Sequence, residues 1–316
     1  YKASGDYFAR LSLAISSGHQ INDILVLEPT TTAWMYYSSS KSNPQFDELG
    51  PGFQKFVTDL EHTQTEYDLG SEDIIERWGK IDGSKLVVGE RAYKLVVIPP
   101  TFENINSKVL ALLEKYLATG GKVLSFVEPP KYVNGKESTE LAKLAKKHAD
   151  QWISANGLYD SKAVELFQSD EIQFKEPEKI GGIFFHHRRV LDDGQLVFLV
   201  NTSDVEWSTG TFSIKGKSVQ EMSLDCGCLS AYPAKQSGKI LEIAFDVPPA
   251  GSLLLYVGNS GENKPIPQKK AKVEIIKAAA SLEINRLEPN ALTWDWCDLT
   301  LDGETEKDMF ELNLRR

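Results

Sequence analysis

Cysteine is scarce in this chain and absent from its first half. Three cysteines occur among 316 residues, and none lies within residues 1–160. So few cysteines exclude a disulfide-built scaffold. The same region holds no Gly-x-Ser-x-Gly or Gly-x-Cys-x-Gly segment, the small-residue elbow that presents a nucleophile above an α/β sheet. The sequence therefore excludes amidotransferase- or peptidase-like nucleophilic chemistry on this part of the chain.

Basic residues and long apolar runs are also lacking. Lys and Arg number 35 against 45 Asp and Glu, a formal net charge of −10. Nucleic acid and anionic membranes both require a basic footprint, so we expect neither as a partner. No apolar run approaches the roughly 20 residues that span a bilayer. The chain begins with Tyr1 and no export signal follows, which predicts a piece of a longer, multidomain protein.

Residues 1–160 show alternating helical and strand patterns. Short, largely apolar runs at 24–27, 86–88, 94–98 and 123–127 are separated by amphipathic segments, the last of them a predicted helix over 138–152. Strands that read as unbroken apolar runs are typical of a parallel sheet covered on both faces. We predict an α/β domain with a flavodoxin-like, class I amidotransferase-like sheet over 1–160. Its ligands would lie at the carboxyl ends of the strands.

The period changes after residue 180. Strand patterns flank the turn at Asp193-Gly194, and further short strands follow at regular spacing. We predict a connecting segment over 161–180 and a small antiparallel β-sandwich over 181–258. A linker over 259–272 would lead to a partial third β domain over 273–316, with a hairpin around Asp302-Gly303.

Four residues near the expected carboxyl ends are candidate substrate contacts. Glu28 and Asp68 supply carboxylates, and Trp34 and Tyr36 supply rings that can stack on a sugar. Glycoside hydrolysis requires two carboxyl groups roughly 5–10 Å apart. The alternative is that the carboxylates are solvated and that the rings pack against a neighbouring domain.

Other motifs favour unremarkable roles. The threonines at 30–32 follow a strand, where flavodoxins bind a phosphate, but without a glycine we interpret them as a solvated loop. His186 and His187 are neighbours on a strand and point to opposite faces. Cys226 and Cys228 offer two ligands where zinc requires four, so turn residues around Gly227 are the preferred interpretation.

Several segments together resemble a known family. Residues 6–12 read DYFARLS and residues 23–29 read DILVLEP, with matching stretches at 17–20, 93–99 and 120–123. This series resembles the region after the catalytic barrel in family 106 glycoside hydrolases, the α-L-rhamnosidase-like enzymes. The α/β part is also similar to the trimerisation domain of family 42 β-galactosidases. The match weakens at residues 226–228, where the family has a different turn.

The resemblance implies where the chemistry of such an enzyme resides. The catalytic glutamates and a calcium ion would belong to a barrel upstream of this chain, so we assign no catalytic residue, metal or cofactor here. The barrel of the same parent chain would be the partner. The substrates would be rhamnose-containing plant glycans, and the location periplasmic or extracellular.

Three functions follow as hypotheses. The first is a non-catalytic accessory region that scaffolds or rims the barrel of a glycoside hydrolase. The second is a carbohydrate-binding module that uses Trp34, Tyr36 and Trp207. The third is an independent small-molecule enzyme on the α/β sheet, which the missing elbow and phosphate motifs disfavour.

Overall fold

The computed structural model describes residues 1–175, 184–262, 285 and 296–310. The chain divides into two compact units, Tyr1–Pro267 and Gln268–Arg316. The first unit contains a parallel sheet with helices and two antiparallel sheets, which confirms the predicted combination of α/β and β structure. The domain boundaries given above stay predictions.

The parallel sheet has five strands. Along the chain they are β1 (Ile24–Leu27), β2 (Tyr67–Gly70), β6 (Leu95–Ile98), β8 (Lys122–Ser125) and β11 (Trp152–Ser154). In space their order is β2-β1-β6-β8-β11. The central strands β1 and β6 are buried at every position, as an apolar strand covered on both faces must be.

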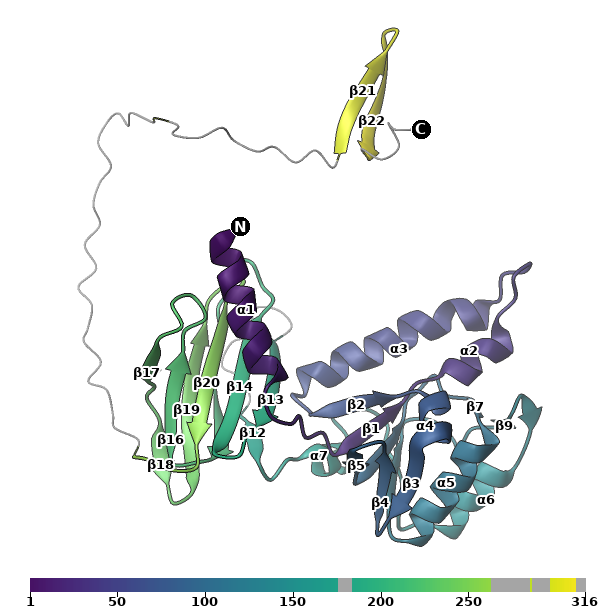
Figure 1. Cartoon of the computed structure of the whole chain (residues 1–316). Helices are drawn as coiled ribbons and strands as arrows, with labels where there is room; N and C mark the ends of the chain where they lie inside the picture. The colour runs from purple at the N-terminus through teal and green to yellow at the C-terminus, as the bar shows by residue number, and fades with distance from the viewer. Residues whose placement is uncertain (176–183, 263–284, 286–295, 311–316) are drawn as a thin grey trace. The chain divides into compact units, whose positions relative to one another are not determined.

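Helices cover both faces of this sheet (Figure 1). Ile24 and Val26 point to one face, where α3 (Pro44–His62) and α7 (Ser161–Phe167) pack. Leu25 and Leu27 point to the other. The helices on that second face are α4 (Glu72–Trp78), α5 (Ser107–Ala118) and α6 (Glu140–Lys147). The alternation of strand side chains thus divides the core into two layers.

Two predictions about this region were wrong in detail. Residues 86–88 lie outside the parallel sheet, in an antiparallel sheet of β3 (Gly79–Asp82), β4 (Lys85–Val88) and β5 (Arg91–Tyr93). Left-handed Gly83 and Gly89 make the tight turns that join them. The helix predicted to reach residue 152 ends at Lys147, and Trp152 begins the edge strand β11. A further small sheet contains β7 (Asn104–Ile105), β9 (Tyr132–Val133) and β10 (Lys136–Glu137).

Two antiparallel sheets enclose the second core of this unit. One contains β13 (Phe184–Val190), β14 (Gly194–Asn201), β20 (Ser252–Gly258), β16 (Ser218–Met222) and β17 (Leu229–Ala231). The other contains β12 (Ile172–Phe174), β15 (Ser208–Lys215), β19 (Ile240–Val247) and β18 (Lys235–Ser237). Buried side chains of both sheets meet between them, with the rings of Phe184 and Phe245 stacked 4.9 Å apart. This arrangement is a β-sandwich.

The first helix packs on the sandwich, although it precedes β1. Helix α1 (Lys2–Ser16) buries Ala14 against Leu196 and Leu254 on the outer face of the larger sheet. The chain then turns at Gly18, whose φ of +59° suits glycine. A side chain there would collide with the carbonyl oxygen of Val190, 2.2 Å from an added Cβ.

The second unit contains a hairpin of β21 (Trp296–Leu301) and β22 (Glu304–Phe310). Asp302 and Gly303 both have positive φ, as a two-residue primed turn requires. The predicted hairpin is therefore present at this turn. The remainder of that prediction, and most of the predicted linker, falls outside the described residues.

Among the described residues, no helix combines the length and apolar character required to cross a membrane.

Candidate functional site

Residues 30–36 form a helix, although we predicted that the threonines at 30–32 lie in a solvated loop. Helix α2 (Thr30–Tyr36) begins directly after β1. Three consecutive β-branched threonines disfavour a helix on propensity alone. Tertiary contacts outweigh this cost, because the buried Thr32 hydroxyl accepts hydrogen bonds from the backbone N–H groups of Glu103 and Asn104, at 3.1 and 3.0 Å.

Three of the four candidate residues lie at the carboxyl edge of the sheet. Glu28 follows β1 and its backbone N–H donates to the carbonyl of Gly70 at 3.0 Å. The side chain of Trp34 is 69% exposed on α2. The Tyr36 hydroxyl donates to Glu103 Oε2 at 2.5 Å, and this hydrogen bond raises the pKa of Tyr36 to about 12.

The fourth candidate, Asp68, points toward the opposite end of the sheet. It pairs with Leu25 near the start of β1. Its carboxylate accepts from Asn22 Nδ2 at 2.7 Å and from the Tyr93 hydroxyl at 2.9 Å. Asn22 lies just before the start of β1, and Tyr93 lies just before the start of β6. The structure therefore does not bring Asp68 together with Glu28 and Trp34. The sequence pattern misplaced it because β2 is only half-buried and its strand boundaries are weakly marked.

A buried glutamate that we did not single out lies at the carboxyl edge. Glu72 is the first residue of α4, after β2, and only 1% of it is exposed. One carboxylate oxygen accepts from the hydroxyl of Thr31, and the other accepts from the backbone N–H of Asn106 at 2.5 Å. Glu72 thus connects the ends of β1 and β2 to the start of α5.

The environment of Glu72 favours its neutral form. Burial raises the pKa of this carboxyl above its usual range, and the charge of Glu76 acts in the same direction. The hydrogen bonds from Asn106 and Thr31 oppose the increase without cancelling it. A raised pKa can indicate a catalytic acid. Here both oxygens are already bonded to neighbouring loops, so the geometry supports a structural role.

The amino edge of the same sheet contacts the sandwich through a buried ion pair. Glu66 directly precedes β2, and Arg188 lies on β13. The guanidinium donates through Nε and Nη2 to the two carboxylate oxygens, each at 2.7 Å, and Nη1 donates to Gln195 at 2.9 Å. This two-pronged geometry is the strongest form of an Arg–carboxylate contact.

The cation determines the protonation of Glu66. Burial alone would raise its pKa, but neighbouring His186 and Arg188 outweigh burial and lower the pKa to about 2. The distance from His186 Nε2 to Glu66 Oε1 is 3.7 Å, too long for a hydrogen bond. Arg188 therefore makes the direct contact, while His186 donates through Nδ1 to Gln64 Oε1 at 3.0 Å.

A cavity of about 410 Å³ adjoins this pair. Its wall includes Gln20, Asn22, Glu61 and His187 together with the apolar Phe198. Burial, followed by the charge of Arg189, lowers the pKa of His187, so its imidazole favours the neutral form. The cavity offers hydrogen-bonding groups with few free charges. Within the described residues, no group of three or more His, Cys, Asp and Glu side chains forms a metal site.

Comparisons with known proteins show similarity of fold. No protein-family model matches the chain, and no curated protein matches it. Among solved structures, the rhamnosidase from Novosphingobium sp. PP1Y is 13% identical with a TM-score of 0.59, over 85% of this chain and 26% of that one. This chain therefore spans about a quarter of that rhamnosidase, and the likeness is one of fold.

Two further solved structures match with lower TM-scores. The exo-carrageenase of family GH42 from Bacteroides ovatus is 16% identical, over 76% of this chain and 29% of that one, with a TM-score of 0.46. The α-L-fucosidase isoenzyme 2 from Paenibacillus thiaminolyticus is 11% identical, over 81% and 51%, with a TM-score of 0.47. Both neighbours are glycoside hydrolases.

Proposed function

We propose that this chain is a non-catalytic accessory region of a larger, α-L-rhamnosidase-like glycoside hydrolase that degrades plant glycans. The observation that carries the proposal is the match to the Novosphingobium rhamnosidase, which includes 85% of this chain but 26% of that enzyme. The parallel sheet and the sandwich would scaffold or rim a catalytic barrel in the same parent chain. An exporting bacterium would carry such an enzyme to the periplasm or beyond.

Two structural features support this proposal. The strands of the parallel sheet follow the order 2-1-3-4-5 when numbered along the chain, the flavodoxin-like order. Its carboxyl edge, where that fold binds ligands, is occupied by the contacts of Glu72, Thr31 and Asn106.

A hydrolysis assay tests the accessory role. The 316-residue chain and the full product of its gene would be compared on nitrophenyl α-L-rhamnoside, β-galactoside and α-L-fucoside. We expect turnover by the full product only, and a β/α barrel encoded upstream. Hydrolysis by the 316-residue chain alone would overturn the proposal.

Sugar binding at α2 is a second candidate function. Trp34 is 69% and Tyr37 is 62% exposed. A cavity of about 320 Å³ is lined by Tyr36 at the end of α2 and by residues that follow this helix. Hydroxyl, amide and aromatic groups line this cavity, namely Tyr36, Ser38, Ser39, Ser40, Lys41, Ser42, Asn43, Phe46 and Asp47. An exposed ring beside hydrogen-bonding groups is suited to one face of a sugar.

Calorimetry with rhamnose-containing oligosaccharides tests this candidate. We expect Trp34→Ala to abolish any binding heat. Trp78→Ala is the matched control, because Trp78 is 67% exposed but lies on α4. Equal binding by both variants would exclude α2 as the sugar contact.

A further inference from the structure

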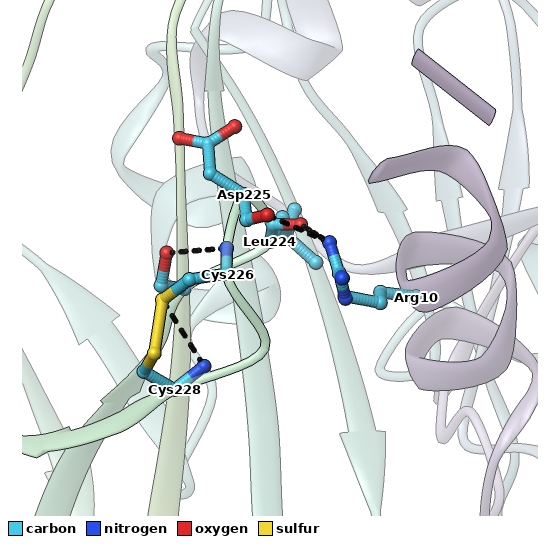
Figure 2. The surroundings of a disulfide bond; sticks show 6 residues. Arg10, Leu224, Asp225, Cys226 and Cys228 are labelled. Atoms are coloured by element: carbon cyan, nitrogen blue, oxygen red, sulfur yellow. Dashed lines mark hydrogen bonds between the residues drawn. A yellow bond between two sulfur atoms is a disulfide. The ribbon is translucent and has the colours of Figure 1, made fainter. Parts of the chain in front are cut away.

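The two cysteines near residue 227 are joined by a disulfide. Cys226 and Cys228 pair in the loop between β16 and β17, with only Gly227 between them (Figure 2). All three residues are exposed, so a thiol in solution can reach the sulfur atoms. The earlier interpretation of these cysteines as simple turn residues did not include this bond.

The bond adds little constraint to the fold. In the chain-entropy model, a disulfide stabilises in proportion to the logarithm of the loop it closes, and this loop is minimal. Backbone hydrogen bonds already hold the turn. Ser223 N donates to the carbonyl of Cys228 at 2.9 Å, and Gly227 N donates to the carbonyl of Ser223 at 2.8 Å. A structural staple is therefore a poor account of this pair.

A hydrogen-bond donor and a cation lie at the loop that holds Cys226. Its Sγ accepts a hydrogen bond from the backbone N–H of Cys228 at 3.3 Å. The guanidinium of Arg10 lies against Gly227, with Nε 3.1 Å from the position a Cβ would take there. Positive charge and N–H donors both lower the pKa of a cysteine thiol, and a more acidic thiol leaves faster in disulfide exchange.

Helix α1 holds that positive charge in place. Arg10 Nη1 donates to the carbonyl oxygens of Leu224 and Asp225, at 2.7 and 2.8 Å (Figure 2). Both acceptors are carbonyl groups of the loop itself, and neither neutralises the guanidinium. Glycine at 227, with a φ of +71°, also leaves the room that Arg10 occupies. The cation and the disulfide are thus brought together by tertiary packing.

We propose that Cys226–Cys228 is a thiol–disulfide exchange site that dithiol reductants open in the folded protein. A reductant thiolate attacks Cys228 Sγ and the Sγ–Sγ bond breaks. The electron pair leaves on Cys226 Sγ, which then takes a proton from water. The second thiol of the reductant attacks the mixed disulfide and releases Cys228, so the dithiol is oxidised to a disulfide as both cysteines are reduced. This redox chemistry is independent of the proposed role in glycan degradation.

Trapping experiments test the proposal on the folded chain with Cys297→Ser, which removes the third thiol. Dithiothreitol is added without denaturant, samples are alkylated with iodoacetamide, and the intact mass is measured over time. We expect no alkylation before reduction and alkylation of both cysteines afterwards, with the melting temperature almost unchanged. A free dithiol in the oxidised protein, or reduction only in denaturant, would overturn the proposal.

The role of Arg10 has its own comparison. We expect Arg10→Gln to slow reduction several-fold and Arg10→Lys to retain most of the rate, because the charge remains. Arg77→Gln removes an exposed charge on α4 and serves as the control. Equal rates for Arg10→Gln and Arg77→Gln would remove Arg10 from the mechanism. If an Arg10 variant fails to fold, the reduction time course of the protein with Arg10 intact still tests whether the disulfide is an exchange site.

Discussion

Two glutamates, Glu72 fully buried and Glu66 largely buried, lie at opposite ends of the same parallel sheet, and their environments differ in kind. Glu72, at the carboxyl end, accepts hydrogen bonds from a hydroxyl and a backbone N–H, and burial raises its pKa. Glu66, at the amino end, accepts two hydrogen bonds from Arg188 and has a pKa of about 2. The carboxyl edge is therefore closed by neutral donors, whereas the amino edge is attached to the sandwich by charge.

The largest expected effect comes from removing the cation at the amino edge. Arg188→Ala leaves the Glu66 carboxylate buried and unpaired, which costs about 3–5 kcal/mol in the free energy of unfolding. Urea denaturation measures this loss. Lys94→Ala is the control, because its pair with Asp23 is exposed and contributes less than about 1 kcal/mol. Similar losses in both variants would show that the Arg188–Glu66 pair contributes no more stability than an exposed ion pair.

The second largest effect is expected from acid, which should reduce the free energy of unfolding by protonating Glu66. A carboxyl whose pKa falls from 4.5 unfolded to about 2 folded stabilises the fold above pH 4.5, and this stability is lost as pH falls toward 2. The difference amounts to on the order of 3 kcal/mol. Urea denaturation between pH 6 and pH 2, with Glu66→Gln in parallel, measures it. A wild-type slope no steeper than that of the variant would contradict the low pKa.

At the carboxyl edge, losing the hydrogen-bonding groups of Glu72 should reduce the free energy of unfolding more than losing its charge. Glu72→Ala leaves the Asn106 N–H without its acceptor and should cost about 2 kcal/mol. Glu72→Gln can still accept from Asn106 and can donate to Thr31, so its cost should be small. Because a raised pKa means that stability is lost as pH rises, the glutamine variant should lose less stability between pH 5 and pH 8 than the wild type. Equal costs for both substitutions would contradict this.

The smallest effect is expected at the exposed rim of the carboxyl edge. Trp34 is 69% exposed, so Trp34→Ala should change the free energy of unfolding by less than about 0.5 kcal/mol. Thermal unfolding measures this. A large loss would mean that the indole packs within the fold, and it would then be a poor sugar contact.

The local sequence pattern was sufficient to predict the central strands of the parallel sheet, but it was insufficient to predict the elements next to them. β1 and β6 were predictable because every position is buried, which leaves an unbroken apolar run. β4 has the same apolar character but pairs antiparallel with β3 and β5, because strand direction depends on the turns at Gly83 and Gly89. Helix α2 was missed because its threonines are stabilised by residues about 70 positions away in the sequence.

The candidate site divides in the same way. Glu28, Trp34 and Tyr36 could be placed at the carboxyl edge because they directly follow an unmistakable strand. Asp68 could not, since its partners Asn22 and Tyr93 come from segments distant in the sequence. Whether any of the four contacts a substrate remains a prediction.

The sequence by itself determined the chemical limits of this protein: an acidic surface, an α/β part without a nucleophile elbow, and a β part rich in turns. These depend on residue types and short-range spacing. Only the tertiary structure decided which charges are paired, since Glu66 meets Arg188 across 122 positions and Arg10 reaches the carbonyl group of Leu224 across 214. The pKa of a buried group depends on such distant partners. The surroundings of Cys226 and Cys228 likewise include Arg10, which is distant from them in the sequence.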